Sequence, residues 1–452
     1  MDNNKNGEHI DLISLPKKSF WKLSIPLSIF IILNNIFSLV DILWISQLNM
    51  EATFALGASG PLLMILNTVG DSIGQGTNST MSRFIGSNKY ESSYNALMHG
   101  LLITIFIGII FLLLTFFMKN LIYLMQIDEN VDIILAYVSP QFCCAIVFLL
   151  CNVLCETFQS EGNSKTPVKI MIFTNILNLI LDPIFIFTFN MGISGAAYAT
   201  IVSTLISVLF FIYLYLTGKT KIPLSLKYFK PNLHIVFEIF KVSIPNTLED
   251  NLAFILQATI VSTIFLTVGQ VGLVLYAVSI RIREFLRAPI RGMGRGLMSV
   301  SGHLFGAKKI EELEKMYIYV LKMSFIVSVI LSISIFFLRD LIYASFQIIN
   351  METPIFYIVL CGIVLIMVYP IYYISAKILD GMGKSYYSLA YNIVRIVVEA
   401  GLILLLKEVF HNGACVLVGI MIGEIVYSSL YIITFKILFK RYKEHEDELV
   451  TT

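Results

Sequence analysis

Long apolar runs, separated by short polar intervals, follow one another along almost the whole chain. A helix needs about 20 mostly apolar residues to span a bilayer, and twelve runs reach that length. The pattern therefore predicts an all-α polytopic membrane protein with twelve transmembrane helices. The predicted spans are residues 20–47, 54–82, 96–118, 131–156, 167–189, 192–217, 234–267, 272–300, 316–338, 354–379, 385–406 and 412–438.

Basic residues gather in alternate intervals between these runs. Seventeen lie in the set that includes the N-terminus, whereas the other set has only Lys119, Arg339 and Lys407. Because positive charge favours the cytoplasmic side, both termini are predicted to be cytoplasmic, in a multi-pass protein of the cell membrane. The seventeen are Lys5, Lys17, Lys18, Arg83, Lys89, Lys165, Lys219, Lys221, Lys227, Lys230, Lys308, Lys309, Lys315, Lys384, Lys440, Arg441 and Lys443.

The longest polar interval lies near the middle of the chain and divides the twelve spans into two sets of six. Six is an even number, so both sets enter the membrane in the same direction, which indicates a parallel repeat of two pseudo-symmetric lobes. The predicted parts are an N-terminal tail, 1–19; an N-lobe, 20–217; a cytoplasmic linker, 218–233; a C-lobe, 234–438; and a C-terminal tail, 439–452.

Short motifs recur between the two halves at a nearly constant offset, as a duplication requires. The offset is 219 or 220 residues in three places. The motif pairs are Ser24-Ile25-Pro26 with Ser243-Ile244-Pro245, Gly86-x-x-Lys89-x-Glu91 with Gly306-x-x-Lys309-x-Glu311, and Glu161-Gly162-x-x-Lys165-Thr166 with Asp380-Gly381-x-x-Lys384-Ser385.

The composition agrees with a membrane protein and excludes several other classes. Apolar residues make up 57% and charged residues 14%, against about 45–50% and about 25% in soluble proteins. With a net charge of +2 and no basic patch beyond the loops, no nucleic-acid partner is expected. No glycine-rich phosphate loop indicates ATP hydrolysis. The chain is expected to be no enzyme, to need no cofactor, and to have the lipid bilayer as its surroundings.

Three carboxylates lie inside predicted spans of the first half: Asp41, Asp71 and Asp182. A charge at the centre of a span costs roughly 2.5–3.5 kcal/mol on insertion scales, so each acid needs a reason to be there. No Lys or Arg lies between Ser24 and Ser82, so no cationic partner is evident nearby. Each acid should therefore hold a proton or bind a metal cation, unless it is a protonated, hydrogen-bonded acid that only packs.

Four spans of the first half place polar side chains on one helical face each. Such faces should converge on a wet interior. Pro183 follows Asp182 and should free a backbone carbonyl and kink the helix, so that an oxygen-rich nest for Na⁺ or a proton forms. The faces are Asn34, Ser38 and Asp41; Asp71, Gln75 and Asn78; Asn175, Asn178 and Asp182; and Thr200, Ser203 and Ser207.

Several motifs make the chain resemble the multidrug and toxic compound extrusion (MATE) family. The resemblance covers essentially the whole chain, including its length, helix count and duplication. The motifs are Glu161-Gly162-Asn163-Ser164-Lys165-Thr166-Pro167, Asn178-Leu179-Ile180-Leu181-Asp182-Pro183, Gly192-Ile193-Ser194-Gly195-Ala196-Ala197-Tyr198-Ala199-Thr200, Ile244-Pro245-Asn246-Thr247-Leu248-Glu249 and Gly306-Ala307-Lys308-Lys309.

The resemblance implies two six-helix lobes in a V, alternating access, and cation-coupled export of organic molecules. It also implies a coupling site at Asp41, Asn178, Asp182 and Thr200, the positions that match the family pattern. Some members have an acid midway along the tenth helix, but residues 368–375 contain none. The resemblance therefore implies a coupling site in the N-lobe only.

The second half carries arginines where the first half carries isolated acids. Four of them repeat every fourth residue along one predicted helix, and acids lie on this and other spans of the same half. Two interpretations stay open: an internal ion-pair network, which the near balance of charges favours and which should pair Arg287, or a partly cationic wall of the central cavity. The residues are Arg283, Arg287, Arg291 and Arg295, with Glu284, Glu249, Asp250, Arg395, Glu399 and Glu424.

The most favoured function is a secondary antiporter that exports small amphipathic organic compounds in exchange for Na⁺ or H⁺, acting as a monomer. The alternative is a flippase for lipid-linked oligosaccharides, because an arginine stripe would suit a pyrophosphate. A non-transporting receptor is the third class, and the large extramembrane domains expected of it are absent from the sequence.

Overall fold

The computed structural model describes residues 11–224, 229–345, 352–410 and 414–444. Lys5 and Lys227 lie outside these ranges, as do most of both tails. The described part consists of helices and connecting loops, without a strand. The elements are α1 (Pro16–Ser46), α2 (Met50–Gly86), α3 (Tyr90–Leu114), η1 (Thr115–Phe117), α4 (Met118–Leu124), α5 (Val131–Cys143), α6 (Ala145–Ser160), α7 (Lys165–Pro183), η2 (Ile184–Thr188), α8 (Ile193–Leu216), α9 (Leu233–Val268), α10 (Gln270–Gly306), α11 (Ile310–Ser345), α12 (Glu352–Gly381), α13 (Tyr386–Phe410) and α14 (Ala414–Glu444).

Each of the twelve predicted spans corresponds to one helix or one bent helix pair. Within the described residues nine helices are long and apolar enough to cross a membrane, or ten when the bent pair α5–α6 counts as one span. The prediction of one continuous helix over 131–156 is wrong, because α5 and α6 meet at Cys144 with a bend of 53°. Several spans are also longer than predicted, and α1 begins at Pro16.

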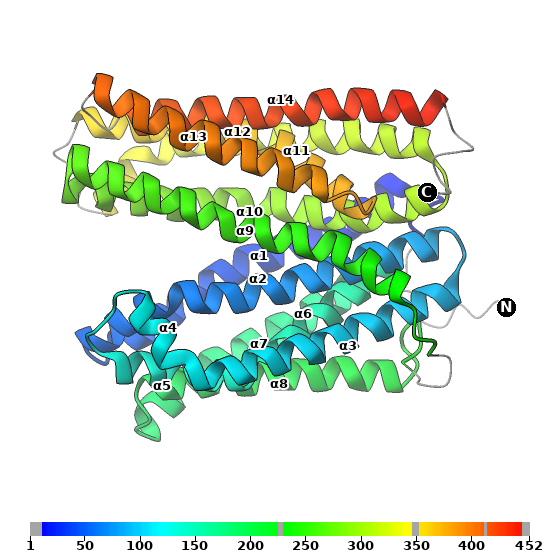
Figure 1. The fold of residues 1–452 in the computed structure, drawn as a ribbon, viewed down its shortest axis with the longest axis horizontal. Coiled ribbons are helices and arrows are strands. Elements are labelled where there is room, and N and C mark those ends of the chain that lie inside the picture. The colour runs from blue at the N-terminus through cyan, green and yellow to red at the C-terminus, as the bar shows by residue number, and fades with distance from the viewer. Residues whose placement is uncertain (1–10, 225–228, 346–351, 411–413, 445–452) are drawn as a thin grey trace.

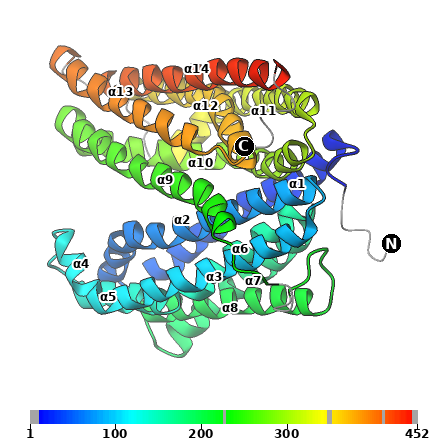
Figure 2. The same cartoon turned by 45° about the vertical axis from the view of Figure 1, so that its right-hand side comes forward.

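The helices form two bundles that follow the two halves of the chain (Figures 1 and 2). The first bundle contains α1 to α8 and the second contains α9 to α14. Within the first, α2 packs on α3 and α6, and α7 packs on α1 and α8. Within the second, α10 packs on α11 and α12, and α13 packs on α9 and α14. These contacts are equivalent under the sequence repeat, so the duplication extends to three dimensions.

The two bundles meet through the same helices of each repeat. Helix α1 packs against α10, and its repeat mate α9 packs against α2; α2 also packs against α10. Two glycines let the backbones approach: a Cβ on Gly296 of α10 would collide with Ser24 of α1, and a Cβ on Gly76 of α2 would collide with Ser243 of α9. The two glycines are related by the offset of the repeated motifs, and so are the two serines. The repeat therefore places small residues at both crossings.

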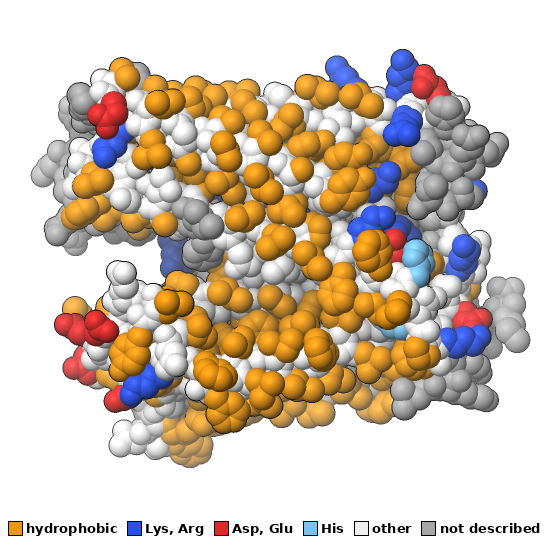
Figure 3. All heavy atoms as spheres, in the orientation of Figure 1, with side chains coloured by type: hydrophobic (Ala, Val, Ile, Leu, Met, Phe, Trp, Pro, Cys, Tyr) orange, Lys and Arg blue, Asp and Glu red, His pale blue; other side chains and the backbone are white. Residues whose placement is uncertain are grey.

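The bundles are joined at the end where α1 begins and α14 ends, and they separate towards the opposite end (Figure 1). At the joined end Gly86 lies against His303 and Gly306 against Arg83, so that α2 and α10 touch backbone to backbone. Arg83 also forms an ion pair of 2.6 Å with Glu238 of α9. Figure 3 shows a notch between the lobes at the other end, with basic side chains inside it. The molecule thus has a cleft that opens away from its termini.

Candidate functional site

Two carboxyl groups from neighbouring helices of the first lobe face each other. Asp41 lies on α1 and Asp182 at the end of α7, and these helices pack together. The side chain of Asp182 is buried, and the two carboxyl groups are within hydrogen-bonding reach of one another. Asn178 Nδ2 donates to Asp182 Oδ1 at 3.2 Å. One oxygen of Asp41 is buried without a hydrogen-bond partner among the described residues, which marks a place for a proton or a cation.

The backbone changes its helical winding directly after Asp182. Pro183 ends α7, and the five residues of η2 continue as a π-helical turn. Proline cannot donate a backbone hydrogen bond, and single π-helical turns within helices occur mostly at functional sites. The expected disturbance of the helix at Pro183 is therefore present beside the carboxyl pair.

The other residues predicted for this site lie on the helices α1, α7 and α8, of which α7 packs on both α1 and α8. Asn175 Nδ2 donates to Asn34 Oδ1 at 3.1 Å, which links α7 to α1. The Thr200 hydroxyl donates to the Ala196 carbonyl of its own helix at 2.9 Å, so its oxygen remains available as an acceptor. Ser38 is exposed on α1.

Tyr137 on α5 interacts with both carboxylates and was not predicted. No repeated motif in the sequence contains this tyrosine, so no sequence signal marked it. Its interaction with the carboxylates is electrostatic, and among the described residues no hydrogen bond joins the Tyr137 hydroxyl to either carboxyl group.

This donor set fits a hard monovalent cation or a proton. Oxygen ligands suit hard cations, and Asp41 has the unpartnered buried oxygen. Among the described residues no group of three or more His, Cys, Asp or Glu side chains could hold a metal ion. The pair of acids with its neutral oxygens is therefore better suited to Na⁺ or H⁺ than to a multivalent metal centre.

Asp71 and Gln75 belong to a different cluster, contrary to the expectation that they line the same interior. Asp71 forms an ion pair of 2.7 Å with Arg295 of α10, so the inference that it lacks a cationic partner is wrong. Arg295 is more than 220 residues away in sequence, so the residues near Asp71 gave no indication of this partner. Gln75 Nε2 donates to the same Asp71 carboxylate at 2.9 Å.

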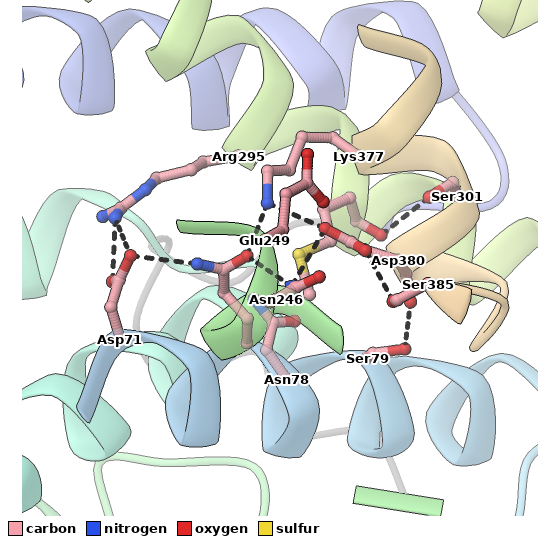
Figure 4. Close-up of polar contacts among 12 residues, drawn as sticks. Asp71, Asn78, Ser79, Asn246, Glu249, Arg295, Ser301, Lys377, Asp380 and Ser385 are labelled. Atoms are coloured by element: carbon pink, nitrogen blue, oxygen red, sulfur yellow. Dashed lines mark hydrogen bonds and ion pairs between the residues drawn. The ribbon is translucent and has the colours of Figure 1, made fainter. Parts of the chain in front are cut away.

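The cluster continues across the contact between the lobes (Figure 4). Gln75 Oε1 accepts hydrogen bonds from Lys377 Nζ at 2.6 Å and from Asn246 Nδ2 at 3.1 Å. The same two donors reach Asp380 Oδ2 at 2.7 and 3.2 Å. Ser79 of α2 donates to the Asp380 backbone carbonyl. Residues of α2, α9 and α12 are thereby connected in one polar network.

Buried Glu156 extends this network into the first lobe. Its Oε1 lies 3.7 Å from the Arg295 guanidinium, and its Oε2 accepts from Asn78 Nδ2 at 2.7 Å. Ser299 of α10 donates to Asn78 Oδ1 at 3.2 Å. The repeated motif that contains Asp380 was a sequence signal for part of the network, whereas Glu156 and Lys377 belong to none of the repeated motifs.

Some charges of the second lobe pair internally, as one of the two interpretations expects. Arg291 and Glu284, both on α10, form an ion pair of 2.6 Å. Arg395 on α13 lies 3.4 Å from Glu424 on α14 and 4.0 Å from Glu399. These pairs tie α13 to α14 and balance part of the buried charge.

Other members of the predicted network use tyrosines as partners. The Arg287 guanidinium lies 4.4 Å from the centre of the Tyr369 ring, and its Nη2 donates to the Tyr372 hydroxyl at 3.4 Å. No carboxylate in the described part of the chain forms an ion pair with Arg283 or Arg287, so the expected acid partner of Arg287 is not found.

The two acids predicted on α9 have different surroundings. Glu249 accepts a hydrogen bond of 2.9 Å from Tyr427, and Asp250 is exposed. Neither forms an ion pair with an arginine among the described residues. Tyrosines that were not predicted as partners thus replace ions of both signs: those of α12 replace an acid beside Arg287, and Tyr427 of α14 replaces an arginine beside Glu249.

The fold, with its carboxyl pair in the first lobe and its arginines in the second, is that of a duplicated helical membrane bundle with a cleft between its lobes. The family model described as MatE matches residues 26–184 and again residues 247–405. The chain therefore belongs to the MatE family, which confirms the resemblance inferred from its motifs and the parallel repeat.

Curated relatives are similar over part of their length. The multidrug export protein MepA of Staphylococcus saprophyticus is 28% identical over 297 residues, and that of Staphylococcus aureus (strain NCTC 8325 / PS 47) is 27% identical. The match covers 65% of this chain and 65% of each relative, so somewhat less than two thirds of their length is spanned.

Solved structures are similar over nearly the whole chain. A MATE protein in the straight conformation superposes with a TM-score of 0.90 at 25% identity, covering 95% of this chain and 97% of that one. An outward-facing multidrug resistance MATE family transporter of the MOP superfamily gives 0.90 at 25% identity, covering 98% and 100%. A MOP superfamily transporter from Pyrococcus furiosus, described as having a binding pocket of reverse polarity, gives 0.89 at 26% identity, covering 95% and 97%.

Proposed function

We propose that this protein is a secondary antiporter that exports small amphipathic organic compounds in exchange for Na⁺ or H⁺. The observation that carries the proposal is the pair of facing acids, Asp41 and Asp182, in a lobe that lines a cleft open at one end. An entering cation relieves the repulsion between the two carboxyl groups, because it removes one of the two like charges that lie next to each other. Multidrug export by the MepA relatives supports the same activity.

The way in which the lobes are joined supports alternating access. The contacts at Arg83, Gly86 and Gly306 close one end, and the notch opens at the other. With the termini in the cytoplasm, as the distribution of basic residues indicates, the open end faces outside. Protons or Na⁺ arriving from outside would then meet Asp41 and Asp182, and their binding would favour closure of the outer end after substrate release.

The coupling ion can supply the energy for export. One charge that moves down a potential of 100 mV releases about 2.3 kcal/mol. This corresponds to roughly a fifty-fold gradient of a neutral substrate for each ion, at about 1.4 kcal/mol per tenfold. No nucleotide hydrolysis is needed.

Efflux by the purified protein in sealed vesicles tests the proposal. Vesicles loaded with a fluorescent amphipathic dye receive an inward Na⁺ gradient in one experiment and an inward proton gradient in another. Dye should leave faster with one of the gradients, and an ionophore that collapses that gradient should abolish the difference. Equal dye release with and without both gradients would contradict coupled antiport.

A flippase for lipid-linked oligosaccharides is the second candidate. Arg283 and Arg287, which have no carboxylate partner within the described ranges, favour it because a pyrophosphate would supply the missing negative charge. Transfer of a fluorescent prenyl pyrophosphate between leaflets, without a need for either gradient, would distinguish this activity from antiport.

A further inference from the structure

The stripe of arginines on α10 divides into a part with acid partners and a part without them. Arg291 pairs with Glu284, and Arg295 pairs with Asp71. Arg287 lies one turn and Arg283 two turns before Arg291 on this helix. Each has a buried Nε atom without a hydrogen-bond partner among the described residues. Arginine keeps its charge in proteins, so this part of the stripe holds two cations that form no direct ion pair with an acid of the described residues. Their link to an acid is indirect: the Tyr372 hydroxyl, which accepts from Arg287, donates to Glu424 Oε1 at 3.5 Å.

Tyrosines form a cradle around these two cations. The Tyr369 ring stacks under the Arg287 guanidinium, and the Tyr372 hydroxyl accepts a hydrogen bond from it. Tyr276 lies beside Arg283, two turns earlier on the same face of α10. Tyrosine hydroxyls hold the guanidinium groups in place and offer hydrogen bonds, but they do not neutralise charge.

Arg283 and Arg287 lie in the half of α10 that is nearer the open end of the cleft. Helix α10 begins at Gln270, at the end where the lobes separate, and ends at the joined end (Figure 1). At about 1.5 Å per residue, Arg287 lies about 25 Å from the start of the helix, which is near its middle. Both arginine side chains keep part of their surface exposed, and basic side chains are visible within the notch (Figure 3).

We propose that Arg283 and Arg287 form a binding subsite for the anionic group of the transported compound. The inference rests on the proposed export function and names its substrate class: amphipathic organic anions or zwitterions with a compact carboxylate, sulfonate or phosphate group. The two guanidinium groups bind the anion, and the tyrosine rings contact its aromatic or apolar body. The carboxyl pair Asp41–Asp182 lies in the other lobe, so substrate and coupling ion would bind to different lobes.

Equilibrium binding to the purified protein in neutral detergent tests the subsite without any gradient. Two dyes with the same xanthene ring system are compared by fluorescence anisotropy at about pH 8, where arginine is fully charged: fluorescein, an anion, and rhodamine 6G, a cation. In the double variant Arg283→Gln/Arg287→Gln, fluorescein affinity should fall at least about tenfold, since charge-assisted hydrogen bonds are lost. Rhodamine 6G affinity should stay within about twofold or rise.

Arg281→Gln is the matched control, because Arg281 has the same charge on the same helix but is exposed and points to a different face. It should change neither affinity. Unchanged fluorescein binding in the double variant, or an equal loss for both dyes, would overturn the proposal. Efflux and binding are measured separately, so failure of gradient-driven efflux leaves this result interpretable.

The unmodified protein provides a second test that does not depend on folding of the variants. Naphthalene-2-sulfonate should displace fluorescein, whereas the naphthalen-2-ylmethylammonium cation should not. Displacement by geranyl pyrophosphate but not by the sulfonate would assign the anion subsite to a lipid-linked pyrophosphate. If none of the anions displaces fluorescein, or if the cation competes equally well, the subsite does not exist.

Discussion

The carboxylate of Asp71 in the first half lies 2.8 and 2.7 Å, at its two oxygens, from one guanidinium nitrogen of Arg295 in the second half. Arg295 is the repeat equivalent of Gln75, at the offset of 220 that relates Gly306 to Gly86. Both equivalents donate to the same carboxylate. The two copies have therefore diverged into complementary parts of one contact, which holds the lobes together in the described conformation.

Loss of the Arg295 charge should destabilise the protein strongly. Arg295→Gln leaves half-buried Asp71 and buried Glu156 without their shared cation, which costs up to the roughly 3–5 kcal/mol of a fully buried pair. Denaturant unfolding in detergent should show this decrease, and Asp71→Asn in the same chain should restore part of it. Lys230→Gln is the control: it breaks an exposed ion pair with Glu91 and should leave the free energy of unfolding nearly unchanged. Equal stability of both single variants would contradict a structural role for the Asp71–Arg295 pair.

Neutralisation of Asp182 should abolish coupled efflux but spare folding. Asp182→Asn keeps the shape of the side chain and removes a buried charge that has no basic partner among the described residues, so the protein should express normally. Gradient-driven dye efflux should fall to the background, and Asp41→Asn should behave alike. Asp128→Asn, in an exposed loop, should have no effect. Normal efflux by Asp182→Asn at wild-type protein levels would contradict the coupling site.

Glu161 should make the folded state less stable as the pH rises towards neutrality. Burial raises the pKa of this carboxyl to about 7 from 4.5, although the backbone amides of Lys221 and Ile222 in the linker donate to it. Because the folded protein binds this proton more tightly than the unfolded chain, stability present below pH 4.5 is lost between pH 4.5 and about 7. The difference is at most about 3 kcal/mol.

Thermal unfolding of Glu161→Gln across the same range measures this contribution. The variant stays neutral at every pH, so its melting temperature should vary less between about pH 5 and pH 8 than that of the wild type. Glu51→Gln, which changes an acid in the first turn of α2, is the control and should keep the wild-type slope. A pH dependence unchanged by Glu161→Gln would show that another group titrates there.

The architecture could be predicted from sequence because its determinants are local or repeated. Hydrophobic length sets each span, and the recurring motifs reveal the duplication. The bend at Cys144 was missed because the span was assigned from its length and apolar character, although Pro140, four residues before the bend, is a signal for a kink. The apolar character of a segment indicates that it lies in the membrane, but it does not indicate where the helix changes direction.

The partners of individual charges were harder to predict because they come from distant helices. Asp41 and Asp182 are brought together as the motif resemblance implied. Asp71 was grouped with them, although its partner Arg295 lies in the other repeat. Counting acids against arginines also failed for Arg287, because tyrosines take part of the role of the acids. Helical spacing identifies which side chains share a polar face, but the packing of the helices determines which residues that face contacts.

The close crossing of α2 and α10 should be sensitive to a single methyl group in either repeat. A Cβ at Gly86 would collide with the His303 backbone, and a Cβ at Gly306 with that of Arg83. Backbone atoms cannot rotate aside as a side chain can, so Gly86→Ala and Gly306→Ala should each cost about 1–3 kcal/mol of unfolding free energy. Because the two positions are related by the repeat, their effects should be similar. Hydrogen exchange at residues 82–90 and 302–310 should accelerate in both variants, because the joined end opens more often.

Gly57→Ala separates this steric effect from the general effect of alanine in a helix. Gly57 also lies in α2, but no atom lies within 4 Å of the Cβ that alanine would add. Since alanine is the better helix former by about 0.5–1 kcal/mol, this variant should be slightly more stable than the wild type. If Gly86→Ala and Gly306→Ala were also more stable, with unchanged hydrogen exchange, the crossing would not be held by backbone contact.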